Sequence, residues 1–391
     1  MKLRREKGFV LIATGVCVFS LLGMLGLAMD LGRVYIAKNE AQAFTDTAAL
    51  AGALALNGIS FTPARNAVAN NTKNQWNLGT TTFTTSGGST TIITEFARPL
   101  AGNLSKPDPA TWEEAPVTAA GYTFIRVTAT ATLPLYILPV VGTRTTQGVK
   151  TISISGQVPL GNFSSGLLPF SPVYHPTTAT PSNPSGFTVG NWYTLRYPGG
   201  ATFTNGDLCS GDQDIPSFLT LVNGQVSDER GFYQNPDAST ARREIINGEM
   251  AYPVSFDETL DPPGQITMYG GAMNTARDAI NDRIRFDTDQ VSHTYAEYQA
   301  NVDANGDRIG NGFRLVGAPV NEGPSAPGVS APRDLVAIGG FFLSAGPTGS
   351  VFYSGGGGQP WCAEYYGTWK KGGGDQGAGL SYLAYVTVLV Q

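Results

Sequence analysis

The sequence predicts an α+β protein with a long N-terminal transmembrane helix, a small α+β domain and a larger β-rich extracytoplasmic domain. Three observations lead to this fold class. An uncharged apolar run lies near the N-terminus, and the middle part of the chain alternates apolar and polar residues with a period of two. Its 391 residues include 49 glycines and 25 prolines, and only 14% are charged. This composition is typical of exported proteins built from short strands and turns, and it disfavours a helical enzyme.

The N-terminal helix is predicted by its length and composition. Phe9 to Ala28 contains twenty residues without a charged side chain. At 1.5 Å per residue they span roughly 30 Å, the thickness of a bilayer's hydrocarbon core. No small-residue cleavage site of a secretory signal follows the run, and helical spacing continues to about Asn57. We therefore predict one helix whose first half lies in the membrane and whose second half faces protein or water.

The charges that flank the apolar run predict its orientation. Four basic residues and one acidic residue, Glu6, precede the run. The positive-inside rule therefore places the N-terminus in the cytoplasm and everything after Asp30 outside. A net charge of −5 without a basic patch after Lys7 argues against nucleic acid as a partner.

Composition and periodicity divide the rest of the chain. In the first domain, strands are expected at Thr91–Phe96, Thr123–Leu133 and Gly148–Val158. In the second, Tyr382–Val390 is apolar on both faces and is expected to form a central strand. The predicted segments are a cytoplasmic basic leader (1–8), a transmembrane helix (9–29), the α+β domain (30–158), a linker rich in Pro, Ser and Thr (159–186) and the β-rich domain (187–391).

Several motifs in the first 158 residues carry a resemblance to a known family. The motifs are Lys7-Gly8-Phe9, Met29-Asp30-Leu31-Gly32, Gln42 with Thr45-Asp46-Thr47-Ala48-Ala49-Leu50-Ala51-Gly52-Ala53, and the segments Phe124–Thr130 and Ile152–Gln157. Together they resemble the TadE/TadG-like family of Flp (Tad) pilus-assembly proteins. The remaining 233 residues match that family much more loosely.

The resemblance implies a structural, non-enzymatic, pseudopilin-like component of a Flp/Tad-type pilus or secretion apparatus. It also implies a single-pass protein of the bacterial inner membrane, with its bulk extracytoplasmic, at the cell surface or in a pilus. Gly8 and Phe9 resemble a prepilin-peptidase site. Type IV pilins usually carry glutamate where this chain has Ala13, which disfavours the main pilus subunit. The alternative is a membrane-anchored surface adhesin or binding module that enters no filament and whose ligand is unknown.

The apolar helix also contains candidate packing positions for other pilus-assembly subunits. Gly23, Ala28 and Gly32 are small, and in lipid small residues let helix backbones approach closely. Asp30 lies at the edge of the run and three residues before Arg33, so both can share one helix face. We expect Asp30 to mark the water boundary and, with Arg33, to face a neighbouring helix. The alternative is that both simply lie in the interfacial layer.

No catalytic residues or organic cofactors are predicted. The two histidines, His175 and His293, lack a G-x-S-x-G elbow that would favour a hydrolase. One oxygen-rich cluster, Asp303, Asn305 and Asp307, has the alternating side chains that suit calcium. The cluster is not an EF-hand loop. The twelfth residue counted from Asp303 is Arg314, where an EF-hand has glutamate. The alternative is a solvated turn.

Two cysteines and a group of aromatic residues complete the candidates. Cys209 and Cys362 both lie outside the membrane, where disulfides persist, and we predict that they are linked. Cys17 lies in the apolar run and is expected to be a small packing residue. The aromatic residues could form an adhesive surface, but in a glycine-rich β domain we expect them to fill the core. They are Tyr295, Tyr298, Trp361, Tyr365, Tyr366 and Trp369.

Overall fold

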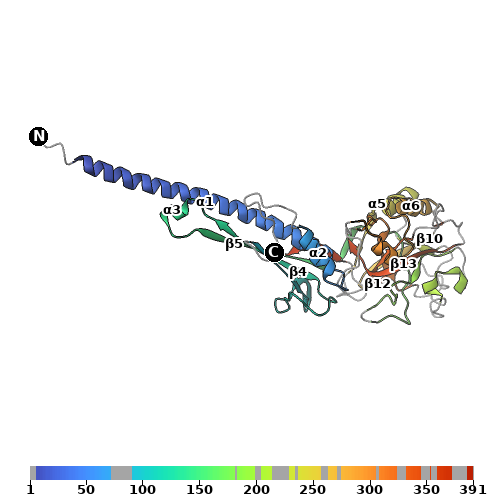
Figure 1. Ribbon diagram of the computed structural model, residues 1–391. Coiled ribbons are helices and arrows are strands. Elements are labelled where there is room, and N and C mark those ends of the chain that lie inside the picture. Colours follow the sequence, from blue (N-terminus) through green and yellow to red (C-terminus); the bar gives the residue numbers. More distant parts are fainter. Residues whose placement is uncertain are drawn as a thin grey trace.

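The computed structural model shows a long helix that projects from an elongated body (Figure 1). It describes residues 6–71, 90–180, 183–198, 204–213, 229–233, 237–256, 263–270, 274–304, 308–323, 332–344, 353, 359–371 and 385–390. Helix α1 (Glu6–Leu54) has 49 residues, which corresponds to a length of about 74 Å. Its first half extends freely, and its second half covers one face of a sheet.

The first sheet lies in the middle of the molecule and has the strand order β1-β4-β5-β15-β14. Its strands are β1 (Thr90–Ala97), β4 (Phe124–Pro134), β5 (Thr146–Pro159), β15 (Tyr385–Val390) and β14 (Lys370–Lys371). All neighbours are antiparallel except β14 and β15. Smaller elements accompany this sheet: α2 (Thr62–Asn70), α3 (Leu138–Val141), and the hairpin of β2 (Pro99–Leu100) and β3 (Asn103–Pro107).

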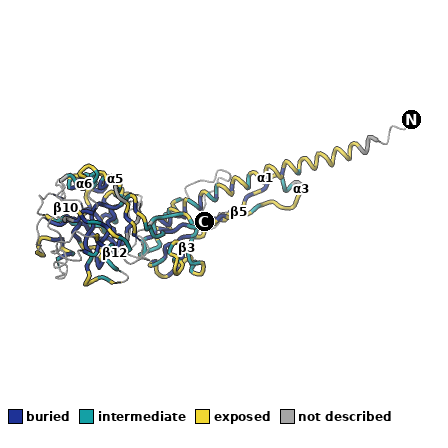
Figure 2. Tube along the Cα trace, turned by 180° about the vertical axis from the view of Figure 1, so that it is seen from behind, coloured by how far each residue is buried: buried dark blue, intermediate teal, exposed yellow. Residues whose placement is uncertain are grey.

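The core of this first domain forms between α1 and the sheet. Small buried residues on α1 permit close packing against the apolar face of β4. Figure 2 shows the resulting contrast between the exposed first half of the helix and the buried centre of the body. The principal contributors are Ala37, Ala41, Phe44, Ala48, Ala49 and Ala53 from α1 with Ile125, Val127, Ala129 and Ala131 from β4.

The second domain is built on a six-stranded sheet with the order β7-β13-β12-β10-β8, in which β11 also pairs with β12. The strands are β7 (Trp192–Arg196), β8 (Glu229–Tyr233), β10 (Gln265–Gly270), β11 (Leu315–Asn321), β12 (Pro332–Phe342) and β13 (Trp361–Thr368). A separate strand pair is formed by β6 (Asn162–Ser165) and β9 (Glu249–Ser255). The helices of this domain are α5 (Ala238–Asn247), α6 (Asn274–Arg285) and α7 (Tyr295–Ala300), and its 3₁₀ turns are η2 (Asn205–Asp207) and η3 (Ser210–Asp212).

The predicted α+β fold class is confirmed, with a long apolar N-terminal helix followed by a β-rich remainder. The aromatic residues named above also fill the core as expected. Tyr298, Trp361, Tyr365, Tyr366 and Trp369 are buried, and Tyr295 packs against one of the core clusters.

Two boundaries differ from the prediction. Residues 159–186 are not a free linker, because Leu167, Phe170 and Val173 are buried and form isolated bridges with the second domain. The closing strand β15 belongs to the first sheet, where it pairs with β5. The second domain is therefore inserted between β5 and β14 of the first, and the domain limits 30–158 and 187–391 do not hold as drawn.

Candidate functional site

The exposed half of α1 is the most prominent candidate for a functional surface. Within the described part of the chain, one helix, Val10–Leu54, is long and apolar enough to cross a membrane. Only 6% of its most apolar window is buried, so it is not the core helix of a soluble domain. The exposed apolar side chains include Val10, Leu11, Ile12, Val16, Phe19, Leu21, Leu22, Met24, Leu25, Leu27, Met29, Leu31, Tyr35 and Ile36.

Asp30 lies where this exposed half meets the first domain. Its carboxylate accepts three backbone N–H groups at the tip of the β4–β5 hairpin: Oδ1 from Tyr136 at 3.1 Å, and Oδ2 from Ile137 at 3.0 Å and Leu138 at 2.8 Å. The hydrogen bond from Leu138 is the main cause that lowers the pKa of Asp30, and it outweighs the opposing effect of burial. The prediction that Asp30 faces a neighbouring helix is therefore wrong, since the side chain is only 2% exposed and binds its own chain.

The small residues of α1 have different surroundings. A Cβ on Gly26 would lie 2.6 Å from Ile137 Cγ2, so this glycine lets the hairpin tip contact the helix. A Cβ on Gly32 would meet nothing within 4 Å, and Ala28 is exposed while Gly23 is half-buried. Gly32 and Ala28 are therefore open positions on the helix surface. Gly8 and Phe9 lie in the first turns of α1, and cleavage between them stays a prediction.

Polar motif residues fasten the second half of α1 to the sheet. Gln42 Nε2 donates to Asp46 Oδ1 at 2.8 Å and to Ser153 Oγ at 3.0 Å, and Ser153 Oγ donates to Asp46 Oδ1 at 2.5 Å. Gln157 Nε2 donates to the carbonyls of Ala53 and Leu56, each at 2.8 Å. These carbonyls lie at the C-terminal end of α1, where a helix lacks internal partners. The sequence motifs suggested an assembly family, but their role in helix-to-sheet contact was not predicted.

Two glycines in the same motifs allow close approach of large side chains. A Cβ on Gly52 would lie 2.5 Å from Ile125 Cδ1, and one on Gly156 would lie 2.1 Å from Phe124 Cδ1. Glycine at these positions therefore permits tight contact between α1 and β4, and between neighbouring strands β4 and β5.

The predicted calcium cluster falls largely outside the described residues. Asp303 is exposed, whereas Asn305 and Asp307 lie outside the described part of the chain, so calcium binding stays a prediction. Within the described residues, no group of three or more His, Cys, Asp or Glu side chains could hold a metal ion. The nearby Asp287 and Asp289 instead accept hydrogen bonds from neighbouring backbone and side-chain groups.

The structure joins Cys209 and Cys362 in a disulfide, with a sequence separation of 153 residues. Next to it, His175 is buried and its Nε2 lies 2.9 Å from Asp212 Oδ1. Asp212 Oδ2 also accepts the N–H of Thr194 at 2.7 Å. His175 therefore belongs to the second domain's core and not to a linker. Cys17 is exposed on the free half of α1.

Comparison with known proteins supports the N-terminal assignment. The family model of Flp pilus-assembly TadE/G-like proteins matches residues 8–55, which is the range of α1 to within two residues at each end. The N-terminal segment is therefore of the TadE/G-like type, as predicted. No curated protein and no solved structure matches the chain. The family match connects the anchor helix with Flp pilus assembly, and it does not extend to the two domains that follow.

We expect Asp30→Asn to weaken the attachment of the hairpin tip to α1. Asparagine keeps the shape of the side chain but removes the negative charge and replaces one acceptor oxygen with a donor. Hydrogen exchange at Tyr136, Ile137 and Leu138 should then accelerate several-fold, while amides in the centre of β4 remain protected. Leu31→Asn, on the neighbouring exposed position, should leave the exchange of these three amides unchanged. Equal exchange in the Asp30 variant and the unmodified protein would contradict this role.

Proposed function

We propose that this protein is a pseudopilin-like structural component of a Flp/Tad-type pilus or secretion apparatus. It is held in the bacterial inner membrane by α1, with the N-terminus in the cytoplasm and both domains outside. The observation that carries the proposal is the free apolar half of α1, which lies within the segment matched by the TadE/G-like family model. The exposed helix would associate with the helices of other assembly subunits, because nothing in the described part of the chain covers those side chains.

The two halves of α1 have different surroundings, and this difference supports the proposed role. The second half is attached to the sheet by small buried residues and by Gln42, Ser153 and Gln157. In the first half, Gly26 and Asp30 contact the hairpin tip, whereas the large apolar side chains from Val10 to Met29 are exposed. A rigid helix with one half built into a domain and the other half free is suited to present the domain from a shared helical bundle. In this proposal the protein positions its domains within the assembly and catalyses no reaction.

The packing of α1 with partner subunits can be tested at Gly32. Because a Cβ there would meet nothing within 4 Å among the described residues, Gly32→Leu should leave the fold and membrane insertion intact. It should reduce photocrosslinking from Ile36, one turn further along the helix, to partner subunits several-fold in native membranes. Gly26→Leu is the matched contrast, since it collides with Ile137 and should loosen the hairpin tip. Unchanged crosslinks in Gly32→Leu would contradict assembly through this face.

Whether the N-terminus is cleaved as in a pilin can be measured directly. Mass spectrometry of the native N-terminus should find Phe9 as the first residue if the chain is processed like a pilin. An intact Met1 would favour an ordinary anchor and with it the adhesin alternative. The aromatic residues that could have supplied an adhesive surface are in the core, so no observation on the described residues favours that alternative.

A further inference from the structure

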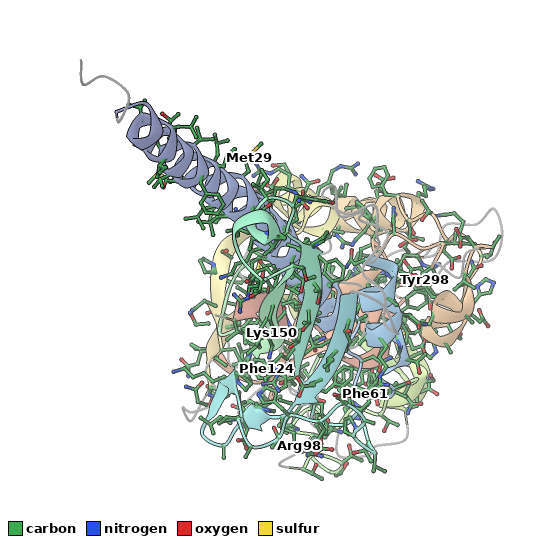
Figure 3. All side chains as sticks on the ribbon, turned by 60° about the vertical axis from the view of Figure 1, so that its left-hand side comes forward. Met29, Phe61, Arg98, Phe124, Lys150 and Tyr298 are labelled. Carbon is green, nitrogen blue, oxygen red and sulfur yellow. A yellow bond between two sulfur atoms is a disulfide. The ribbon has the colours of Figure 1, made fainter. Side chains whose placement is uncertain are left out.

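The tip of the β4–β5 hairpin has a composition that its place in a soluble domain does not explain. We define the tip segment as Leu135–Val141, which includes α3 and contains no charged residue in the run Leu-Tyr-Ile-Leu-Pro-Val-Val. It lies beside α1, at the end of the first domain that points toward the N-terminus (Figure 1). In Figure 3 the labelled Met29 lies close to this end of the hairpin. The tip segment is thus placed at the end of the apolar helix run.

The contact with Gly26 determines how deep the tip segment lies relative to the predicted membrane span of α1. Gly26 lies inside the uncharged run Phe9–Ala28, and the Ile137 side chain is packed against it. Gly26 is three residues before Met29, so Ile137 lies about 5 Å below the end of the predicted span, at a rise of 1.5 Å per residue. Interfacial apolar segments typically enter a bilayer to about this depth, roughly 5–10 Å.

Non-helical backbone is tolerated at this depth only if its polar groups have partners. Asp30 supplies them, because its carboxylate accepts the N–H groups of Tyr136, Ile137 and Leu138. The Leu135 N–H donates to the Thr145 carbonyl at 2.9 Å, and the Gly142 N–H donates to the Leu138 carbonyl at 2.8 Å. These contacts satisfy the N–H groups of Leu135 to Leu138 and of Gly142, which would otherwise face hydrocarbon.

The side chains around the tip segment also fit an interface with lipid. Tyr136 is 64% exposed, and tyrosine is enriched where hydrocarbon meets headgroups. The Arg33 guanidinium lies 4.2 Å from the centre of the Tyr136 ring. An arginine at this height can reach the phosphate layer while its stem remains in apolar surroundings.

We propose that the tip segment inserts into the bilayer leaflet on the side of the folded domains and forms a second membrane contact beside α1. The inference rests on the proposed function in one respect, namely that α1 spans the membrane. A second contact, held to the first by Asp30 and Gly26, fixes the rotation of the first domain about the helix axis. It thereby determines which face of the sheet and of α1 is presented to neighbouring subunits.

Site-directed spin labelling of the full chain in vesicles of phosphatidylethanolamine and phosphatidylglycerol tests this insertion. Cys17→Ala removes the free thiol, and Tyr136→Cys introduces one at an exposed position without removing a buried side chain. The label should be several-fold more accessible to oxygen, which partitions into lipid, than to a water-soluble nickel complex. Val117→Cys, in a fully exposed loop of the same domain, should show the opposite ratio.

A third label separates failure of the inference from failure of the anchor. Leu22→Cys lies on the exposed surface of α1 within the predicted span. If the label at 22 reports lipid and the label at 136 reports water, α1 still spans the membrane but the tip segment does not insert, and the inference is overturned. If both report water, the membrane-spanning role of α1 falls as well. A label at 136 that is shielded from both reagents only in native membranes would indicate a protein partner and would also overturn the lipid contact.

Discussion

Replacing Arg314 with methionine should lower the free energy of unfolding of the second domain by about 3–5 kcal/mol, the usual cost of breaking a buried ion pair on one side. Arg314 is fully buried. Its Nε donates to the Leu343 carbonyl at 2.7 Å, its Nη1 to the Asp289 carbonyl at 2.9 Å and its Nη2 to the Ser292 carbonyl at 2.5 Å. Methionine has a similar length but no donor, so these acceptors and the Asp289 carboxylate, 3.8 Å from Nη1, would lose a partner.

The surrounding carboxylates make the loss more severe. Burial raises the pKa of Asp289, but hydrogen bonds led by the one from Ser292 outweigh it, and the net pKa lies below the ordinary value of 3.8. The carboxylate therefore keeps its charge at neutral pH and would remain charged and buried in the variant. The backbone N–H of Arg314, which methionine keeps, also donates to Asp287 Oδ2 at 3.1 Å, so the loss comes from the guanidinium alone.

Urea unfolding of the full chain, followed by tryptophan fluorescence, measures this effect. Arg285→Met is a matched control, because the Arg285 side chain is 61% exposed and pairs with Asp282 at the surface. Surface ion pairs contribute roughly 0–1 kcal/mol, so the control should unfold almost as the unmodified protein does. Equal losses in the two variants would contradict a central role for Arg314.

Elements specified by local signals could be predicted from the sequence. Helix α5 has such signals at both ends: Asp237 accepts the N–H groups of Ser239 and Thr240, and Gly248 adopts the left-handed conformation with φ 69°. Likewise, the apolar run predicted α1, and strict alternation over Thr123–Leu133 predicted β4. In each case the residues that determine the element lie within it or next to it.

Long-range partners could not be predicted in the same way. A strand that is apolar on both faces, such as β15, fits the interior of either sheet, and nothing in its own residues selects β5 as its neighbour. The composition of residues 159–186 predicted a linker, but composition does not reveal that Phe170 is buried against Phe232. Similarly, a lone Asp30 at the end of an apolar run gives no sign that its partners lie about a hundred residues away.

The candidate site could therefore be predicted only in part from the sequence. Length and apolarity identified the free half of α1, and motif similarity identified the segment that the family model matches. The open surface at Gly32 and the occupied one at Gly26 could not be distinguished, because both are glycines in the same helix. The difference arises from the β4–β5 hairpin, which reaches back along α1 to one face and leaves the other uncovered.

Removing the disulfide by Cys209→Ala with Cys362→Ala should lower the free energy of unfolding of the second domain by roughly 3–5 kcal/mol, because the bond restricts a long loop of the unfolded chain. The segment between the cysteines, whose sequence separation is 153, includes β8, β10, β11 and β12, so the bond encloses most of the second sheet. In the folded chain it holds the η3 turn against β13. The Cys209 N–H also donates to Thr194 Oγ1 at 3.1 Å.

Non-reducing mass mapping of the native protein should first show the Cys209–Cys362 peptide pair. The double variant and Cys17→Ala, which removes only the exposed thiol of α1, would then be compared by urea unfolding without reductant. Because Asp212 remains bound to His175 and Thr194, the η3 turn should keep its native position in the double variant. The loss should therefore appear as a lower free energy of global unfolding, with little change in hydrogen exchange confined to that turn. Alkylation of both thiols in the untreated native protein, or an unfolding free energy equal to that of Cys17→Ala, would show that the bond does not stabilise this domain.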